Sequence, residues 1–404
     1  MENPKYTACL EITSDYAKFA VGNVLHNQPV ILYYAKKPLK GGLVRGEIDN
    51  PKLIQDIIKG FLQIEDESLG LKINGTSVSV VVPPLGFQVY GYRTVTNVIA
   101  STSLIDKIDI ANVMSLVKKE AIPNGNVIVD IVPDAFILSN GKGYANPPLG
   151  EKSDSLAVQA KVHTLPEKLL YDYRSTVEGA GFRVKRACVA TYCASQLIAS
   201  DKTMPETYIY VDIGAHLTTV SFIGKTSPFG SLFFAEGGDD LTSAIAEAFS
   251  VSLEDAALLK EKYGYDPRVS KYQMPLIKSK DDDGKPTVYY QNNLNAVIEN
   301  FFDTYDSLLN NAITTLLSRK LVAEGGMEKI PLVFGGGGSL LYGLASLLVS
   351  SVGKRPYFLY APKVIGARDP GAINLLGLIC AEGSYRGTLE DNYHGVSTLS
   401  RDRQ

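Results

Sequence analysis

Alternating apolar and polar residues at the start of the chain predict a β-hairpin. The stretch "YTACLEITSDYAKFAVGNV", residues 6–24, runs as an apolar strand up to Ile12, turns at the polar tip Thr13 to Asp15, and resumes as a second apolar strand. Further apolar strands are predicted at residues 29–38 and 77–84. Between these strands, apolar residues at helical spacing predict a helical segment, "NPKLIQDIIKGFLQIEDESLG", over residues 50–70.

The pattern changes between about Gly86 and Pro166. Short strands are predicted in "GNVIVDIVPDAFILSN" and "SLAVQAKVHTLP", and a single helix is predicted around "DKIDIANVMSLVKKEA". We interpret this stretch as a small inserted α+β subdomain. A second helix, "PEKLLYDYRSTVEGAGF", follows it and leads into residues 184–200, which are rich in small side chains.

The layout of the first hairpin then returns in "TYIYVDIGAHLTTVSFIGK", residues 207–225. Glu11 and Asp212 occupy equivalent places in the two hairpins, which indicates an internal duplication. Helices are predicted at about 240–249 and 292–319, followed by the strand "KIPLVFGG" and an apolar helix in "DPGAINLLGLICAEG". The polar, aperiodic residues 384–404 predict a disordered tail.

The composition is typical of a folded, soluble protein. Of the 404 residues, 45% are apolar and 21% are charged, and this length predicts roughly two to four domains. The net charge of −3 provides no electrostatic attraction for nucleic acid, which we exclude as a partner. The four scattered cysteines predict reduced core thiols of a cytoplasmic protein. No stretch reaches the ~18 apolar residues that a transmembrane helix requires.

Three turns that follow apolar strands are candidate ligand-binding loops. They contain Thr13 and Ser14, then Gly214, then the run Gly335 to Gly338. Ligands of α/β proteins bind at the carboxyl ends of strands, and bare backbone amides can wrap a phosphate where no Cβ atom intervenes. Two facing hairpins would clamp a polyphosphate. The glycine turn would let a base or a ribose lie against its backbone.

Charged residues beside these turns suit a nucleotide that carries Mg²⁺. Lys18 would reach across its own hairpin and neutralise phosphate charge. Glu11 and Asp212 would hold the water shell of a Mg²⁺ ion, which retains several waters and favours carboxylates. No direct metal site made of protein side chains is predicted.

Each of these features also has an ordinary structural interpretation. The glycine run fits a tight connection between a strand and a helix, and Thr13 to Asp15 has ordinary turn chemistry. Lys18 fits a solvated surface lysine, and an aspartate of "EGGDD" fits a helix cap. His216 has no acidic partner nearby in the sequence, which favours a surface turn.

Taken in order, the motifs resemble those of the actin-like ATPase superfamily, and in detail those of FtsA, a bacterial cell-division family. The resemblance runs from about Tyr6 to Gly383. "LEITSDYAK" resembles the first phosphate loop, "VDIGAHLTT" the second, and "VFGGGGSLLYGL" the adenosine loop, while "EGGDDLTSAI" and "SLEDAALLKEKYG" resemble FtsA segments after the second loop. The resemblance implies an α/β actin-like fold of duplicated, ribonuclease H-like domains with an inserted small α+β subdomain of the FtsA type.

The resemblance also implies a division into subdomains and a set of site residues. Subdomain 1A would comprise 1–85, 167–205 and the C-terminal helix, and 86–166 would be subdomain 1C. Subdomain 2A would comprise 206–240 and 320–383, and 241–319 would be subdomain 2B. Asp212 is the candidate catalytic residue. The expected nucleotide-binding residues are Glu11, Thr13, Ser14, Lys18, Asp212, Gly214, Ala215, His216, Gly237, Gly238, Asp239, Lys260, Gly336, Gly337, Gly338 and Ser339.

The function implied by the resemblance is that of an ATP-binding protein that polymerises into filaments. It would bind the C-terminal peptide of FtsZ and other division proteins, and tether FtsZ filaments to the inner face of the cytoplasmic membrane at the division site. Glu11, Thr13 and Ala257 stand where the family usually has aspartate, glycine and glutamate. We therefore expect ATP binding with slow or absent hydrolysis. The tail has no amphipathic face of the kind that lies in a membrane interface.

Two other functions use the same fold. A PilM-like adaptor of pilus assembly also carries a small inserted subdomain, but the longer chain and "LKEKYG" favour FtsA. A small-molecule kinase requires a base that activates the acceptor hydroxyl. The sequence has no second acidic motif suited to that role, so the kinase is disfavoured.

Overall fold

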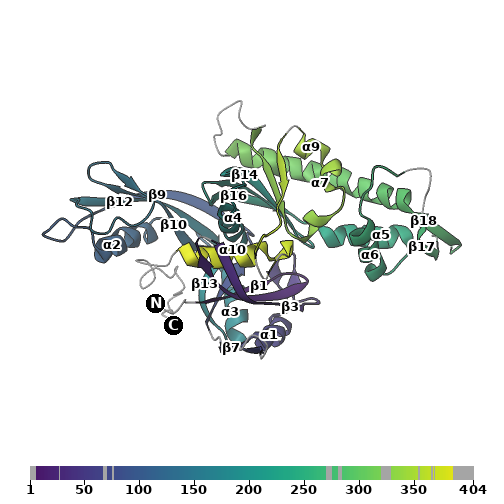
Figure 1. Ribbon diagram of the computed structural model, residues 1–404, viewed down its shortest axis with the longest axis horizontal. Coiled ribbons are helices and arrows are strands. Elements are labelled where there is room, and N and C mark those ends of the chain that lie inside the picture. The colour runs from purple at the N-terminus through teal and green to yellow at the C-terminus, as the bar shows by residue number, and fades with distance from the viewer. Residues whose placement is uncertain are drawn as a thin grey trace.

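The computed structural model describes residues 6–26, 28–66, 71–74, 77–269, 275–280, 284–319, 329–353, 355–364, 367 and 369–384. The chain forms two five-stranded sheets that share two central helices, and further elements extend from both ends of the molecule (Figure 1). The predicted tail lies outside the described residues except for its first residue, Ser384. No helix in the described part of the chain is both long enough and apolar enough to cross a membrane.

The first sheet has the strand order β13-β8-β1-β2-β3. The predicted hairpin is confirmed, because β1 and β2 pair in antiparallel register with Glu11 opposite Lys18. Alternate residues of the strands face opposite sides. Leu10 and Phe19 pack against helices α1 and α3, whereas Cys9 and Ala20 pack against α4 and α10. The elements are β1 Thr7–Ile12, β2 Tyr16–Leu25, β3 Gln28–Pro38, β8 Ser77–Val82, β13 Arg183–Val189, α1 Pro51–Ile58, α3 Glu167–Gly179, α4 Ala190–Ser200 and α10 Ile373–Ser384.

The second sheet repeats this plan with the order β16-β15-β14-β19-β20. Asp212 lies opposite Thr219 in the β14–β15 hairpin, in the same position that Glu11 has opposite Lys18. Its two faces pack against the long helix α7 and against α4 and α10, so these last two helices contact both sheets. The elements are β14 Thr207–Ile213, β15 Thr218–Gly224, β16 Ser227–Phe234, β19 Leu332–Gly335, β20 Tyr357–Leu359 and α7 Gln291–Arg319.

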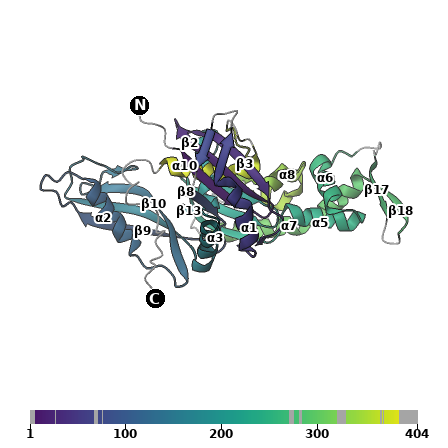
Figure 2. The same cartoon turned by 90° about the horizontal axis from the view of Figure 1, so that it is seen from below.

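The remaining elements lie outside these layers. At one end of the molecule, a four-stranded sheet of order β11-β10-β12-β9 packs on α2 around its own apolar core (Figures 1 and 2). At the other end lie α5, α6 and the β17–β18 hairpin. The elements are β9 Gln88–Asn97, α2 Lys107–Lys118, β10 Asn126–Leu138, β11 Gly143–Tyr144, β12 Ser155–Pro166, α5 Gly238–Phe249, α6 Leu253–Tyr263, β17 Pro275–Lys280 and β18 Pro286–Tyr290. Shorter pieces are β4 Leu43–Val44, β5 Glu47–Ile48, η1 Lys59–Phe61, β6 Gln63–Asp66, β7 Leu71–Asn74, η3 Gly337–Leu340, α8 Leu344–Leu347, α9 Val349–Val352 and η4 Pro370–Ala372. The helix predicted over residues 50–70 is therefore wrong for its second half, because β6 pairs with β7 in an antiparallel hairpin.

All four cysteines are buried and none forms a disulfide, as the sequence predicted. His163 on β12 is buried as well. Its ring lies edge-on to the rings of Phe87 and Tyr192, at centroid distances of 5.3 and 5.2 Å. Neither ring nitrogen has a hydrogen-bond partner among the described residues. Burial, aided by the nearby charges of Lys161 and Arg186, lowers the pKa of His163 to about 3.

Acid is therefore expected to destabilise the protein through His163. An unfolded histidine has a pKa of about 6.5, so between that pH and about 3 the unfolded state binds a proton that the folded state does not. The free energy of unfolding should fall by about 1.4 kcal/mol per pH unit in this window from His163 alone. His163→Phe should flatten this slope between pH 6 and pH 4 in urea unfolding curves. Equal slopes for the two proteins would contradict the assignment.

Candidate nucleotide-binding site

A cavity of about 550 Å³ is lined by the tips of both equivalent hairpins and by the glycine turn. The structure brings Ser14, Asp212 and Gly337, which are far apart in the sequence, to this one cavity. Every residue of the expected nucleotide-binding set lines it except Ser339. The Ser339 hydroxyl is buried and donates to the Gly336 carbonyl at 2.7 Å, so this side chain closes the turn instead of facing a ligand.

Both hairpin tips present unpaired backbone amides to the cavity. At the first tip the Thr13 amide and hydroxyl both donate to the Tyr16 carbonyl, and at the second the Gly214 amide donates to the Leu217 carbonyl. These bonds close the turns. Within the described residues, four backbone amides of the two tips have no acceptor: those of Ser14, Asp15, Ala215 and His216. Such unpaired amides are suited to hold an anion.

The start of α5 fixes the shape of the second tip. The Gly238 amide donates to the Gly214 carbonyl at 2.9 Å, and the Asp239 amide donates to the Ala215 carbonyl at 2.8 Å. Gly237 permits this contact, because a Cβ atom there would lie 2.6 Å from the Gly214 carbonyl oxygen. Asp240 caps the helix by accepting from the Gly237 amide at 2.8 Å. The capping interpretation of this segment is therefore correct, and these helix amides hold the loop.

The glycine run is bare mainly because it packs against the end of β14. Gly336 has φ +78°, and a Cβ atom there would collide with the Asp212 carboxylate and lie 2.5 Å from the Ile213 carbonyl oxygen. Added Cβ atoms at Gly335 and Gly338 would collide with Tyr210 and Ile213. Of the four glycines in this run, only Gly337 would have no other atom within 4 Å of an added Cβ atom. Packing therefore accounts for the missing side chains at Gly335, Gly336 and Gly338, while contact of Gly336 to Gly338 with a nucleotide stays a prediction.

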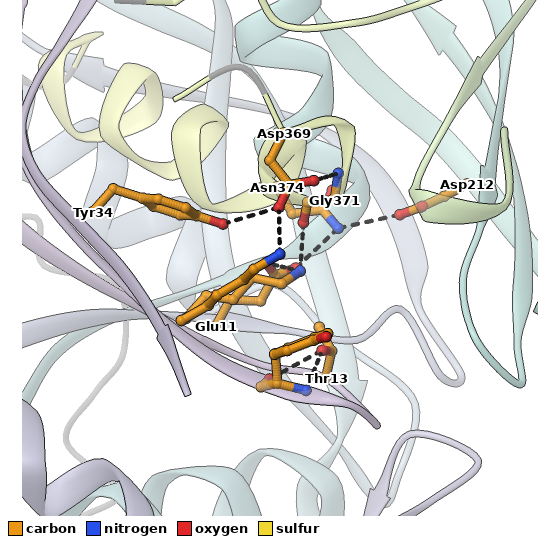
Figure 3. Close-up of polar contacts among 10 residues, drawn as sticks. Glu11, Thr13, Tyr34, Asp212, Asp369, Gly371 and Asn374 are labelled. Carbon is orange, nitrogen blue, oxygen red and sulfur yellow. Dashed lines mark hydrogen bonds and ion pairs between the residues drawn. The ribbon is translucent and has the colours of Figure 1, made fainter. Parts of the chain in front are cut away.

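A buried polar network links the two hairpins on the floor of the cavity (Figure 3). Lys18 is buried with its Nζ atom 3.2 Å from Glu11 Oε2, and it also donates to the Gly371 carbonyl. The solvated-lysine interpretation of Lys18 is therefore wrong. Asn374 Nδ2 lies 3.1 Å from Glu11 Oε1 and 3.1 Å from Asp212 Oδ2. Asp212 is half-buried. Burial raises its pKa, and this effect outweighs the hydrogen bond from Asn374, which lowers it.

Sequences of cell-division proteins are similar to this chain over most of its length. FtsA from Enterococcus hirae is 26% identical over 391 residues, which cover 95% of this chain and 84% of that protein. FtsA from Streptococcus pneumoniae is 24% identical over 84% of this chain and 74% of that protein. FtsA from Bacillus subtilis is 24% identical over 94% of this chain and 84% of that protein. No protein-family model matches the chain.

Solved structures establish the fold. The PilM–PilN type IV pilus biogenesis complex contains a chain with a TM-score of 0.58 and 20% identity, covering 93% of this chain and 98% of that one. MreB5 of Spiroplasma citri bound to ADP has a TM-score of 0.55 and 13% identity, covering 96% and 98%. The chain has an actin-like fold, and its sequence is similar to those of FtsA proteins. The predicted resemblance and fold class are confirmed, and the likeness to PilM is one of fold.

At the mouth of the cavity, the structure gathers charges that the sequence alone did not bring together. His216 Nδ1 lies 3.5 Å from Asp240 Oδ1, and His216 Nε2 lies 3.7 Å from Asp239 Oδ2. His216 lies in a surface turn, as the sequence predicted, and its side chain is 43% exposed. Its acidic partners come from outside the turn, because the start of α5 folds back onto the second tip. Asp15 faces the same region, where its burial, together with the charge of Asp239, raises its pKa. Lys260 donates to the Gly238 carbonyl and to Thr242, and burial lowers its pKa.

Sequence reasoning missed the segment that enters α10. Asn374 and Gly371 contact the hairpin residues directly, and Asp369 accepts from Tyr34 and Lys36 on β3. The apolar helical pattern of this segment indicated only packing. The available signal was one polar residue, Asn374, within "AINLLGLICA". Glu261, beside Lys260 on α6, also lines the cavity and was not among the expected residues.

Proposed function

We propose that the chain is an ATP-binding, actin-like cell-division protein of the FtsA kind. The observation that carries the nucleotide part is the pair of equivalent hairpin tips whose unpaired amides line one cavity. The cell-division part rests on the sequence similarity to FtsA over most of the chain. MreB5, which shares the fold, has been solved with ADP bound.

In this proposal the triphosphate lies between the two tips. The amides of Ser14 and Ala215 donate to phosphate oxygens from opposite sides, and Lys18 supplies positive charge below them. The base and ribose lie toward Gly337, where bare backbone faces open space, with Lys260 and Glu261 alongside. Glu261 offers a carboxylate to ribose hydroxyls in place of the glutamate that the family usually has at the Ala257 position.

The residues present fit a hydrated Mg²⁺ ion. Within the described residues no group of three His, Cys, Asp or Glu side chains can hold a metal directly. Glu11 and Asp212 present carboxylate oxygens, and the Asn374 Oδ1 atom is buried without a partner among the described residues. All three accept hydrogen bonds, which is what metal-bound water molecules donate. When bound to the nucleotide, the ion would neutralise phosphate charge.

We further propose that hydrolysis is at most weak. Asp212 remains the candidate that orients water. One of its carboxylate oxygens, however, already accepts a hydrogen bond from Asn374, and Glu11 lies nearby. A small-molecule kinase is disfavoured because its acceptor needs a separate base, and the cavity floor has already committed Glu11 to Lys18 and Asn374. A PilM-like adaptor role is disfavoured because the similar sequences named above are those of FtsA proteins.

The finer parts of the proposal concern assembly and location. We propose the subdomain division 1A, 1C, 2A and 2B given above, with the four-stranded sheet around α2 forming 1C. We also propose that the chain self-associates into filaments, binds the C-terminal peptide of FtsZ and other division proteins, and acts at the inner face of the membrane. Sedimentation with and without ATP tests assembly, and a pull-down with the FtsZ tail peptide tests that partner.

A bulky side chain at Gly337 should block nucleotide binding without harming the fold. Gly337→Val places its side chain in open space of the cavity wall and should weaken Mg-ATP binding at least about tenfold in isothermal titration, since it fills the space proposed for base and ribose. Gly91→Val on β9 is the matched control, because a Cβ atom there also meets nothing within 4 Å and the residue does not line the cavity.

The wild-type protein decides the proposal itself. Detectable Mg-ATP binding with slow phosphate release supports it, and absence of binding at millimolar nucleotide rejects it. Brisk phosphate release would reject the weak-hydrolysis part only. Equal affinities for Gly337→Val and Gly91→Val would show that the nucleotide lies elsewhere than proposed.

A further inference from the structure

We propose that Asn374 is a positioning residue that joins the two duplicated halves of the protein through their equivalent carboxylates. This inference rests on the nucleotide site proposed above. A single nitrogen, Asn374 Nδ2, lies at hydrogen-bond distance from Glu11 at the end of β1 and from Asp212 at the end of β14. The amide thus connects the two hairpins, and its bonds to Glu11 and Asp212 can be followed in Figure 3.

The chemistry of the partners fixes the orientation of this amide. Ionised carboxylates only accept hydrogen bonds, so the Asn374 atom between them has to be the nitrogen, which carries two hydrogens. One hydrogen can point to each carboxylate. The Asn374 oxygen then has no partner among the described residues, and it is buried in a residue that lines the cavity. It is a ready acceptor for a water molecule that belongs to a bound cation.

The helix that carries Asn374 is anchored in both halves. Leu375 and Leu378 pack into the cluster that contains Cys9 and Ala20 of the first sheet. Ile373 and Leu376 pack into the cluster that contains Tyr208 and Tyr210 of the second sheet. Because α10 is held from both sides, the Asn374 amide is a fixed point, and the separation of the two carboxylates is set by their bonds to it.

The same amide also acts on the Asp212 carboxyl group. Burial raises the pKa of Asp212, and the negative charge of Glu11 raises it further, whereas the hydrogen bond from Asn374 and the charge of Lys18 lower it. Without the amide, the Asp212 carboxylate would lose both this hydrogen bond and its fixed distance from Glu11. Mg-ATP binding should therefore weaken when Asn374 is replaced.

Two variants of similar size separate positioning from packing. Asn374→Leu removes the donor, and Asn374→Asp replaces it by a third carboxylate. In isothermal titration at pH 6, 7 and 8, each should bind Mg-ATP at least about tenfold more weakly than the wild type. The loss should shrink when the titration is repeated with ATP in EDTA, because the carboxylates act through the hydrated cation.

A packing role would produce a different result. It predicts that Asn374→Asp behaves like the wild type, and that any effect is independent of Mg²⁺. Melting temperatures check the fold, and Asn374→Ala, which leaves room for water, replaces Asn374→Leu if the latter unfolds. Wild-type protein that binds Mg-ATP while both variants match it at every pH would overturn this inference alone. Wild-type protein that does not bind would overturn the proposed function instead.

Discussion

Replacing Gly336 with alanine is expected to destabilise the protein by about 2–4 kcal/mol and to abolish nucleotide binding. The backbone of Gly336 has φ +78°, a region that costs an alanine about 1–2 kcal/mol. The added Cβ atom would also collide with the Asp212 carboxylate and lie 2.5 Å from the Ile213 carbonyl oxygen. Relief of that collision has to move β14, which carries the second hairpin tip. Urea unfolding followed by circular dichroism measures the first effect, and titration with Mg-ATP the second.

Gly337→Ala is the matched control for this substitution. It lies one residue along the chain, has no positive φ, and would have open space around its Cβ atom. Its unfolding midpoint should equal that of the wild type. Equal midpoints for Gly336→Ala and the wild type would mean that β14 and the glycine turn do not approach each other as the structure has them.

These two glycines show how far a sequence pattern can be taken. The run of four glycines predicted a turn at the end of a buried strand, and the structure has one there. The run alone cannot distinguish glycines required by neighbouring backbone from glycines that face a ligand. That distinction depends on which strand lies alongside, and the parallel pairing of β14 with β19 is a long-range contact. Gly337 is the one glycine of the run that packing against β14 does not require.

The two hairpins were easier to predict than the floor of the cavity. Each hairpin is local, so apolar alternation around a polar tip indicates it directly, and the repeated acid made Glu11 and Asp212 comparable. Asn374 lies far away in the sequence, within an apolar helix, and acquires its partners only when α10 packs between the sheets. His216 is similar, since its acidic partners come from the start of α5.

The largest effect outside the cavity is expected at Arg186, which joins the four-stranded sheet to the first five-stranded sheet. Arg186 on β13 contacts Asp130 on β10 at 2.5 Å and Glu382 on α10 at 3.5 Å, and all three side chains are buried. Glu382 also accepts from Lys185 at 3.0 Å and from Ser79 at 3.1 Å. Burial alone would raise the pKa of Glu382, but Arg186 and Lys185 outweigh it and hold that pKa below its ordinary value. For Asp130, burial outweighs the charge of Arg186 and the hydrogen bonds from Arg186 and Ile131, so its pKa is raised.

Arg186→Met should therefore cost about 3–5 kcal/mol at neutral pH, because it leaves two buried carboxyl groups without their shared cation. Arg174→Met is the matched control, since Arg174 on α3 contacts Glu178 at 2.9 Å in a solvent-exposed pair that is worth about 0–1 kcal/mol.

The lowered pKa of Glu382 predicts a second effect, on the pH dependence of stability. Its stabilising contribution is present above the unfolded pKa of about 4.3 and is lost as the pH falls through the lower folded value, so the stability gap between wild type and Arg186→Met should narrow in acid. Unfolding midpoints of the three proteins at pH 7 and pH 4 test both points, and a gap that stays constant or widens in acid would show that Glu382 gains no stabilisation from Arg186.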